Sequence, residues 1–351
     1  MLKRLVTKST SALVSTLILA NLLASCTAPQ VSQETGTTTA AGATAGEACA
    51  PELATLEFGI ISTESQDNQK PKWEPFIDAM EVALGRSVNA SYATDYAGVI
   101  EAMGAGKVQI AWYGGKSYVT AAENADAEAF AQTIAADGSD GYYAYLITNK
   151  ENPILADIDV EKGDGDQYVL KNASKLTFAF NDPESTSGYL VPSYYIFAQA
   201  GVNPNEAFEE LVFAGSHEAT AQAVANNQVD VATNNSESLN ALKESDAAAL
   251  DKIQVIWTSP VIPSDPLAYR KDLPDCLKTQ IKDFFYNYKD AAILGPLDWS
   301  KFVPADDSKW NTIRELNIGK EILEVQNDKN LGDADKQKKV EELKQKLAAL
   351  K

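Results

Sequence analysis

The sequence is poor in the residues that hold metal ions: its 351 residues include three Cys and one His. Zinc sites draw most of their ligands from Cys and His, so these numbers nearly exclude one, and we expect neither a metal nor another cofactor. Long apolar runs are equally scarce, and a single run near residues 13–24 excludes a chain that crosses a membrane several times. A composition that is 45% apolar and 23% charged is ordinary for a globular protein of one large domain or two.

Positive charge is also in deficit. Lys and Arg number 30 against 49 Asp and Glu, a net charge of −19, and without residues 1–25 the balance is 27 against 49, or −22. Nucleic-acid binding depends on clustered Lys and Arg that displace counterions. The charge balance therefore argues against nucleic acid as a partner.

The N-terminus has the pattern of an export signal. Three basic residues among the first eight precede an apolar segment that is shorter than the roughly 20 residues of a membrane-spanning helix. That segment ends in Leu-Ala-Ser-Cys at 23–26, which resembles the bacterial lipobox, where the Cys thiol takes a diacylglycerol. We expect a signal peptide at 1–25, lipidation of Cys26 and an exported protein anchored to the bacterial membrane. The alternative is an ordinary signal cut nearby, with Cys26 incidental.

Residues 26–50 are rich in Thr, Ala, Gly and Ser and have almost no large apolar side chain. Such a segment cannot bury enough surface to offset the entropy of ordering, so we predict a flexible tether. The two other cysteines are Cys49 and Cys276. Export permits a disulfide between them, but the sequence alone leaves open whether they meet.

From residue 56 onward, short apolar runs alternate with apolar residues at helical spacing. The runs predict strands at 56–61, 88–93, 108–113, 176–180, 212–214, 229–232 and 253–257. Helices are expected within 73–84 and 99–103, and near 187–200, 218–226 and 236–243. This alternation predicts two α/β lobes, each with a mainly parallel sheet, and a ligand cleft at the strand ends.

Polar residues gather where predicted strands pass into helices. Ser185, Thr186 and Ser187 precede an apolar helix, where hydroxyls either cap the helix or donate to an anion. Capping explains one hydroxyl well and three poorly. His217 and Glu237 also lie at helix starts, although a lone His is more often structural and a carboxylate there is commonly a partner of the helix dipole. These loops contain no Lys or Arg, so anion binding would rest on hydroxyls, amides and His217.

Seven stretches give the chain a specific resemblance. They are Phe58–Ser65, Asp95–Gly98, Ile110–Gly114, Ala135–Ser139, Asp182–Gly188, Gln228–Asn235 and Ile262–Pro266. With them the chain, from about residue 56 to its C-terminus, resembles the phosphonate-binding proteins of bacterial phosphonate ABC importers. The resemblance implies a type II periplasmic-binding-protein fold, with two α/β lobes joined by two hinge strands. It departs from the family in the lipobox and tether and in a short extra segment near 161–175.

The resemblance also implies roles for individual residues. The phosphonate oxygens would be held by donors at two helix starts and a tyrosine, namely Ser185, Thr186, Ser187, His217 and Tyr96. Tyr142 would line the cleft. Glu237 and Asp265 would receive the amino group of 2-aminoethylphosphonate. Relatives that bind phosphite or methylphosphonate need no such pair of acids, because those ligands carry no ammonium.

The implied lobes are 51–141 with 266–325, and 142–265. The two crossings between them fall beside Tyr142 and Asp265, so ligand contact would be coupled to closure.

The C-terminal tail, 326–351, carries an apolar seam of a/d spacing at Val340, Leu343, Leu347 and Leu350. A helix packed on its own lobe explains this seam, and so does a homodimer contact. Two heptads alone are marginal for a free coiled coil.

Three functions remain to be compared. The first is a solute-binding lipoprotein that captures a small phosphonate and delivers it to an ABC permease with its ATPase. The second is a Ser-His-Asp hydrolase of a small anionic ester, built from Ser185 or Ser187 with His217 and Asp265, but no Gly-x-Ser-x-Gly surrounds either Ser. The third is a binder that presents its ligand to a membrane sensor. The resemblance favours the first, with no catalytic residue.

Overall fold

The computed structural model describes residues 49–350. The predicted signal peptide 1–25, the lipidation site Cys26 and the tether up to residue 48 lie outside the described residues. Within 49–350, no helix is long and apolar enough to cross a membrane.

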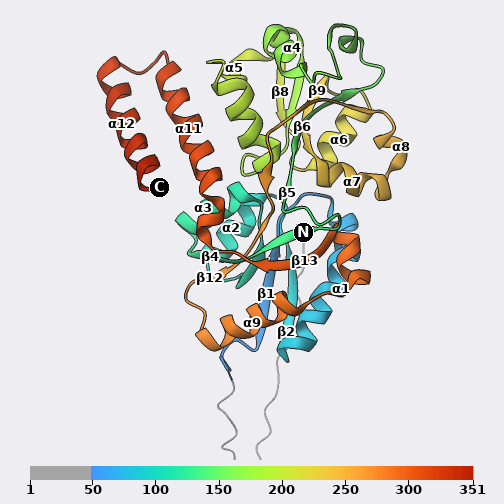
Figure 1. Cartoon of the computed structure of the whole chain (residues 1–351), viewed down its shortest axis with the longest axis vertical. Helices are drawn as coiled ribbons and strands as arrows, with labels where there is room; N and C mark the ends of the chain where they lie inside the picture. Colours follow the sequence, from blue (N-terminus) through green and yellow to red (C-terminus); the bar gives the residue numbers. More distant parts are fainter. Residues whose placement is uncertain (1–48, 351) are drawn as a thin grey trace, which may run out of the picture. The chain divides into compact units, whose positions relative to one another are not determined.

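Two sheets organise the described part of the chain (Figure 1). Lobe one holds a six-stranded sheet of order β13-β4-β12-β3-β1-β2. Its strands are β1 (Thr55–Ile60), β2 (Ser87–Tyr92), β3 (Ile110–Trp112), β4 (Ala127–Ala135), β12 (Pro266–Arg270) and β13 (Trp299–Pro304). Lobe two holds a five-stranded sheet of order β10-β6-β9-β7-β8. Its strands are β6 (Ala144–Asn149), β7 (Thr177–Phe180), β8 (Glu210–Phe213), β9 (Val231–Asn235) and β10 (Ile253–Thr258).

The expectation of mainly parallel sheets is wrong, because both sheets are mixed. Strands β3, β1 and β2 are parallel, as are β9, β7 and β8, since helical crossovers connect strands of this kind. The other pairs are antiparallel: β12 with β3 and β4, β13 with β4, and β6 with β9 and β10. Several of these antiparallel strands lie directly before or after a crossing between the lobes. They run opposite to the parallel strands of the same sheet.

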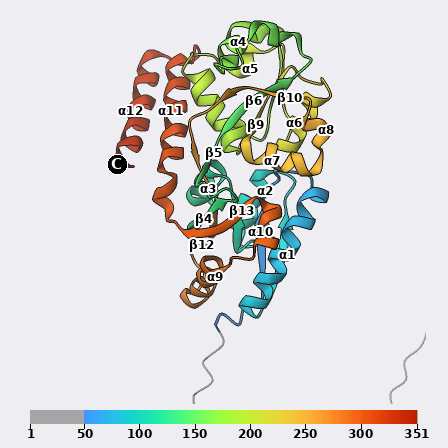
Figure 2. The same ribbon diagram turned by 45° about the vertical axis from the view of Figure 1, so that its right-hand side comes forward.

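Helices cover both faces of each sheet (Figures 1 and 2). In lobe one they are α1 (Gln66–Leu84), α2 (Tyr96–Gly104), α3 (Gly115–Asn124), α9 (Asp275–Asn287) and α10 (Ala291–Leu294). In lobe two they are α4 (Gly165–Asn172), α5 (Pro204–Ala207), α6 (His217–Ala225), α7 (Ser236–Ser245) and α8 (Ala247–Leu250), with π-helical turns at Thr186–Leu190 and Ser193–Ala198. Helix α4 lies in a polar stretch for which the sequence predicted no element.

Alternating side chains of β1 and β3 fill two separate cores. Phe58 and Ile110 pack with α1 and α9 in one core, which includes Phe76 and Phe285. Ala111 faces the other core, with α2 and α3. This period of two fixes which strand residues point toward the helices on each face.

The chain crosses between the lobes twice. The crossing segments β5 (Gly141–Tyr142) and β11 (Ile262–Pro263) pair with each other as a short antiparallel ladder. A Cβ on Gly141 would come within 2.7 Å of the Ile262 carbonyl oxygen, so the close approach of the two segments requires glycine there.

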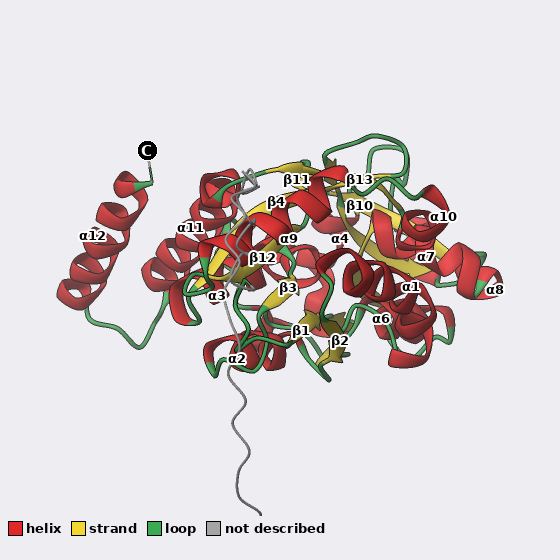
Figure 3. Cartoon of the chain, turned by 90° about the horizontal axis from the view of Figure 1, so that it is seen from below, coloured by secondary structure: helices red, strands yellow, loops and turns green. Residues whose placement is uncertain are grey.

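The C-terminal helices α11 (Asn311–Asn327) and α12 (Asp333–Ala349) form a hairpin at the side of the lobes (Figures 1 and 3). Helix α11 packs on α3 of lobe one and on the π-helical turn Ser193–Ala198 of lobe two. Helix α12 lies against α11 and buries Val340 and Leu343. Leu347 and Leu350 of the predicted seam are half-buried.

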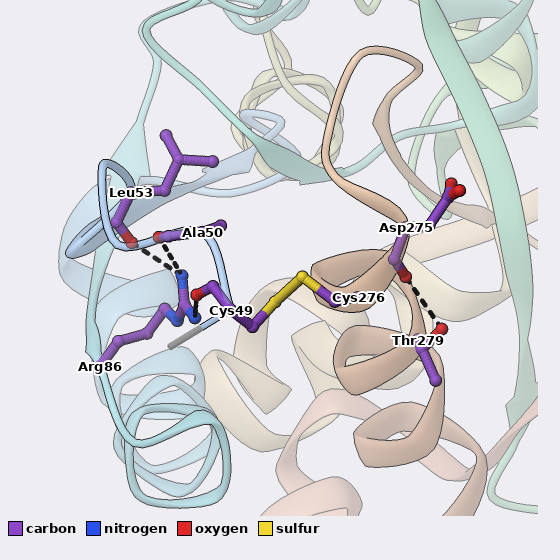
Figure 4. Close-up of a disulfide and its surroundings, with 7 residues drawn as sticks. All are labelled: Cys49, Ala50, Leu53, Arg86, Asp275, Cys276 and Thr279. Atoms are coloured by element: carbon purple, nitrogen blue, oxygen red, sulfur yellow. Dashed lines mark hydrogen bonds between the residues drawn. A yellow bond between two sulfur atoms is a disulfide. The ribbon is translucent and has the colours of Figure 1, made fainter. Parts of the chain in front are cut away.

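A disulfide joins Cys49 to Cys276 at the start of α9, with 5.9 Å between the Cα atoms (Figure 4). Beside it, the Arg86 guanidinium donates to the carbonyl oxygens of Cys49 and Leu53, each at 2.8 Å. The structure thus settles the pairing that the sequence left open.

Because the two cysteines are 227 residues apart, the bond removes much freedom from the unfolded chain. We expect Cys276→Ser to lower the free energy of unfolding by about 2–4 kcal/mol. Urea denaturation of the oxidised protein and the variant measures the difference. Reduction should destabilise the wild type and leave the variant unchanged. Equal stability of oxidised wild type and variant would contradict the prediction.

Candidate functional site

A cavity of about 620 Å³ lies between the two lobes. The structure brings every predicted site residue to its wall: Tyr96, Tyr142, Ser185, Thr186, Ser187, His217, Glu237 and Asp265. They converge because β1, β3, β7 and β9 all end at the cavity, and the helices that follow begin there. Helices α2, α6 and α7 start at or next to Tyr96, His217 and Glu237.

The three hydroxyls are held as hydrogen-bond donors. Ser185 Oγ accepts from the Gly188 amide at 3.0 Å and from Asn181 Nδ2 at 3.2 Å. Thr186 Oγ1 accepts from the Lys116 amide at 2.9 Å. Since these N–H groups occupy hydroxyl lone pairs, the O–H protons remain to be donated.

Ser187 follows the same rule. Its Oγ accepts from Asn235 Nδ2 at 3.0 Å, and the side-chain Oδ1 of Asn235 in turn accepts from the Ser238 amide at 2.6 Å. Asn235 and Asn181 were not among the predicted site residues. An Asn directly after a strand and before a helix is the sequence signal that could have indicated Asn235.

Gly188 makes this arrangement possible. A Cβ at this position would lie 2.4 Å from Asn181 Cβ and 2.8 Å from Ser185 Oγ. Any side chain here would displace the donor that orients Ser185.

His217 is a buried, neutral member of the cluster. Burial lowers the pKa of the imidazole to about 3. Its Nε2 lies 3.5 Å from Ser185 Oγ, 3.4 Å from Ser187 Oγ and 3.1 Å from Asn235 Nδ2. This part of the cavity wall is therefore polar, and His217 adds no charge to it.

A Ser-His-Asp triad is not assembled among these residues. His217 Nδ1 and Asp265 Oδ1 are both without a hydrogen-bond partner in the described part of the chain, so Asp265 does not orient the imidazole. A catalytic base needs that third group to fix its tautomer.

Carboxylates also line the cavity. Burial raises the pKa of Asp265 well above its ordinary value, and the charge of Glu237 adds to the effect. Burial, and then the charge of Asp298, raise the pKa of Glu237 to about 7. Asp298, which the sequence did not single out, also lines the cavity. Buried acids with raised pKa values favour a cation between them.

Two lysines near the site are paired with carboxylates. Lys72, on the wall, pairs with Glu64 at 2.6 Å, and the Lys116 ammonium pairs with Glu184 at 2.9 Å. Thr120 Oγ1 also donates to Glu184, at 2.7 Å.

A third lysine, Lys243 of α7, also lines the cavity, is exposed and makes no ion pair among residues 49–350. That hydroxyls, amides and His217 hold an anion, with no Lys or Arg in their loops, stays a prediction.

The lobes are hydrogen-bonded to each other around the cavity. The amides of His217 and Glu218 donate to the Thr63 carbonyl oxygen at 3.1 and 3.3 Å. The Glu218 carboxylate accepts from the Ser65 amide at 2.7 Å and from Asn68 Nδ2 at 2.9 Å. Glu218, in lobe two, thus holds the start of α1 in lobe one.

We expect Glu218→Ala to weaken the binding of every phosphonate about 3- to 30-fold, because it removes hydrogen bonds to a charged group that hold the two lobes together. Calorimetric titration with 2-aminoethylphosphonate and ethylphosphonate should show similar losses, and small-angle scattering a larger radius of gyration for the free variant. Glu206→Ala, an exposed acid of α5, is the charge-matched control. Unchanged affinity and radius would show that Glu218 does not stabilise closure.

Two α/β lobes, two crossing strands and an interlobe cavity lined by helix starts define a type II periplasmic binding protein. The family model described as the periplasmic substrate-binding protein of a phosphonate ABC transporter matches residues 58–310. The chain belongs to this family.

The curated phosphonates-binding periplasmic protein of Escherichia coli is 47% identical over 296 residues, which are 83% of this chain and 84% of that protein. A crystal structure of a binding-protein component of a phosphonate ABC transporter from Pseudomonas aeruginosa is 44% identical, with a TM-score of 0.79, and covers 84% of this chain and 96% of its own. A Prochlorococcus marinus protein in complex with methylphosphonate shares the fold at 22% identity, with a TM-score of 0.67, over 77% of this chain and 99% of its own.

Family membership confirms the first of the three predicted functions in its phosphonate binding and its ABC transporter, but not in its lipid anchor. The chain is a phosphonate-binding protein that is exported to the periplasm and works with an ABC transporter, and it is not an enzyme.

Proposed function

We propose that the preferred ligand is 2-aminoethylphosphonate, held with its phosphonate at the hydroxyl cluster and its ammonium at Glu237 and Asp265. The observation that carries this proposal is that one cavity is lined by two kinds of group. Oriented O–H donors come from Ser185, Thr186 and Ser187, and acids with raised pKa values are Glu237 and Asp265. A ligand with both a phosphonate and an ammonium matches both kinds of group in charge.

Binding would be coupled to closure of lobes 51–141 with 266–325 and 142–265. Tyr142 lies in β5, and Asp265 lies just after β11, so each contact with ligand acts on a crossing segment. Tyr96 supports this coupling, because its amide donates to Asp182 Oδ2 across the lobes at 3.3 Å.

Calorimetric titration with 2-aminoethylphosphonate, ethylphosphonate, methylphosphonate, phosphite and phosphate tests the proposal. We expect 2-aminoethylphosphonate to bind at least about tenfold more tightly than ethylphosphonate, a difference of about 1.4 kcal/mol. Equal affinity for these two ligands would remove the aminophosphonate preference and leave a general phosphonate binder.

Two further proposals concern how the protein is held at the membrane. We propose that Cys26 carries a lipid anchor, which the lipobox sequence supports, and that residues 26–48 form its tether. The predicted tether of 26–50 is two residues too long, because Cys49 is bonded to Cys276 and Ala50 is buried. Metabolic labelling with a fatty acid should mark the wild type and not Cys26→Ser. A homodimer through α12 is supported by half-buried Leu347 and Leu350. Light scattering should then give twice the chain mass, and a single chain mass at high concentration would reject the dimer.

A further inference from the structure

Three tryptophans from distant parts of the chain form one aromatic wall of the cavity. Trp73 comes from α1, Trp112 from the end of β3 and Trp299 from the start of β13. The Trp73 ring centroid lies 5.3 Å from that of Trp112 and 5.3 Å from that of Trp299, and the last two are 5.7 Å apart. Trp73 and Trp299 are buried and hold Trp112, which is only partly buried.

This wall lies beside the acids. Trp112 pairs with Leu267 in the sheet, two residues after Asp265, and its side chain opposes the rise in the pKa of Asp265. Trp299 directly follows Asp298, whose charge acts on Glu237. The indole Nε1 of Trp112 and Oδ1 of Asp265 are both buried and without a hydrogen-bond partner among residues 49–350. Aromatic rings and acids therefore share the part of the cavity assigned to the ammonium.

Tryptophan faces attract cations through the negative face of the ring, and quaternary ammonium groups are bound in this way. Such a group donates no hydrogen bond, so it depends on ring faces and on nearby negative charge. The cavity has room for it: about 620 Å³ is in the range of pockets that enclose drug-sized molecules, and 2-aminoethylphosphonate fills only a small part of that volume.

We propose that the site accepts N-alkylated 2-aminoethylphosphonates up to the trimethylammonium derivative, with Trp112 as the residue that determines this specificity. This inference depends on the proposed function, because it places the ammonium at the acids. Trp112 supplies the most accessible ring of the wall, while Trp73 and Trp299 fix its position.

The first experiment uses the unmodified protein. Calorimetric titration with 2-aminoethylphosphonate, its N-methyl and N,N,N-trimethyl derivatives, and ethylphosphonate should give dissociation constants for the three amines within about tenfold of one another. A trimethyl derivative more than about tenfold weaker than 2-aminoethylphosphonate overturns the inference and leaves the proposed function intact. Should 2-aminoethylphosphonate bind no better than ethylphosphonate, the proposed function fails, and the inference fails with it.

The second experiment tests Trp112. We expect Trp112→Leu to weaken the trimethyl derivative about tenfold and ethylphosphonate less than about threefold, with Trp112→Phe recovering most of the loss because it keeps a ring face. Equal losses for the trimethyl derivative and ethylphosphonate in Trp112→Leu would assign the residue a purely structural role and overturn its part in specificity.

Discussion

Replacing Glu237 with Ala is expected to weaken the binding of 2-aminoethylphosphonate by about 2–4 kcal/mol. The variant leaves a buried ammonium without one of its carboxylates, beside Asp265, whose own pKa is raised by burial and by Glu237. Ethylphosphonate has the same phosphonate end and no amine, so its affinity should change by less than about 1 kcal/mol. Calorimetric titration of both ligands measures the difference, which a general loss of folding would not produce.

The matched control is Glu206→Ala, an exposed acid of α5 in the same lobe that does not line the cavity. It removes the same charge away from the site, and both ligands should bind as they do to the wild type. If Glu237→Ala weakens the binding of both ligands equally, Glu237 only stabilises the start of its helix, and the aminophosphonate proposal is wrong.

Because the pKa of Glu237 is raised, the affinities of the same two ligands should depend on pH in different ways. With its pKa at about 7, Glu237 is mostly neutral at lower pH and must lose a proton to pair with an ammonium. The ratio of 2-aminoethylphosphonate to ethylphosphonate affinity should therefore rise between about pH 5 and 8, and Glu237→Gln should flatten it. The ammonium lowers the second pKa of the phosphonate below that of ethylphosphonate, so each affinity is first corrected for the separately measured titration of its own ligand, and the pH dependence that remains is that of the protein.

Loss of one oriented hydroxyl should affect every phosphonate alike. Ser185→Ala or Thr186→Ala removes a donor to a charged group, worth about 1.5–3 kcal/mol, so affinity should fall about tenfold or more. Titration with 2-aminoethylphosphonate and ethylphosphonate should give equal losses, and Thr186→Ser should retain most of the affinity because it keeps the hydroxyl.

Ser193→Ala provides the control for these variants. Ser193 is buried in the next π-helical turn of the same segment, does not line the cavity, and its hydroxyl has no partner in the part of the chain that the structure describes. Its loss should leave affinity unchanged. If Ser185→Ala and Thr186→Ala bind with wild-type affinity, the hydroxyl cluster does not contact the ligand.

The candidate site could be predicted in part because much of its chemistry is local. Hydroxyls, His217 and Glu237 follow predicted strands and start helices, and the amphipathic pattern fixes those positions within a few residues. Tyr96, Tyr142 and Asp265 came from the resemblance, since no local pattern distinguishes a cleft tyrosine from a core one.

The hydrogen-bond partners that orient these groups could not be predicted from the sequence in the same way. Asn181 and Asn235 fill the acceptor sites of the serines, and Glu218 holds α1 across the lobes. Asn181 is only four residues from Ser185, but the bonds of Asn235 and Glu218 join residues 48 and 153 positions apart, and spacing carries no information about them. The mixed direction of the sheets was missed for a related reason: apolar runs predict strands but not the direction in which a strand enters its sheet.

By itself, the sequence predicted the strands β1–β3 and β7–β10 with the helices that follow most of them, the acidic charge and the placing of polar residues at helix starts, all of which depend on neighbours in the chain. It did not predict β4, β6, β12 or β13. The tertiary structure alone decided the disulfide of Cys49 with Cys276 and the wall of Trp73, Trp112 and Trp299. These residues meet because strand order and the two lobe crossings bring distant segments together. Periodicity and propensity extend over a few turns or one strand, whereas these contacts are set by the packing of the whole chain.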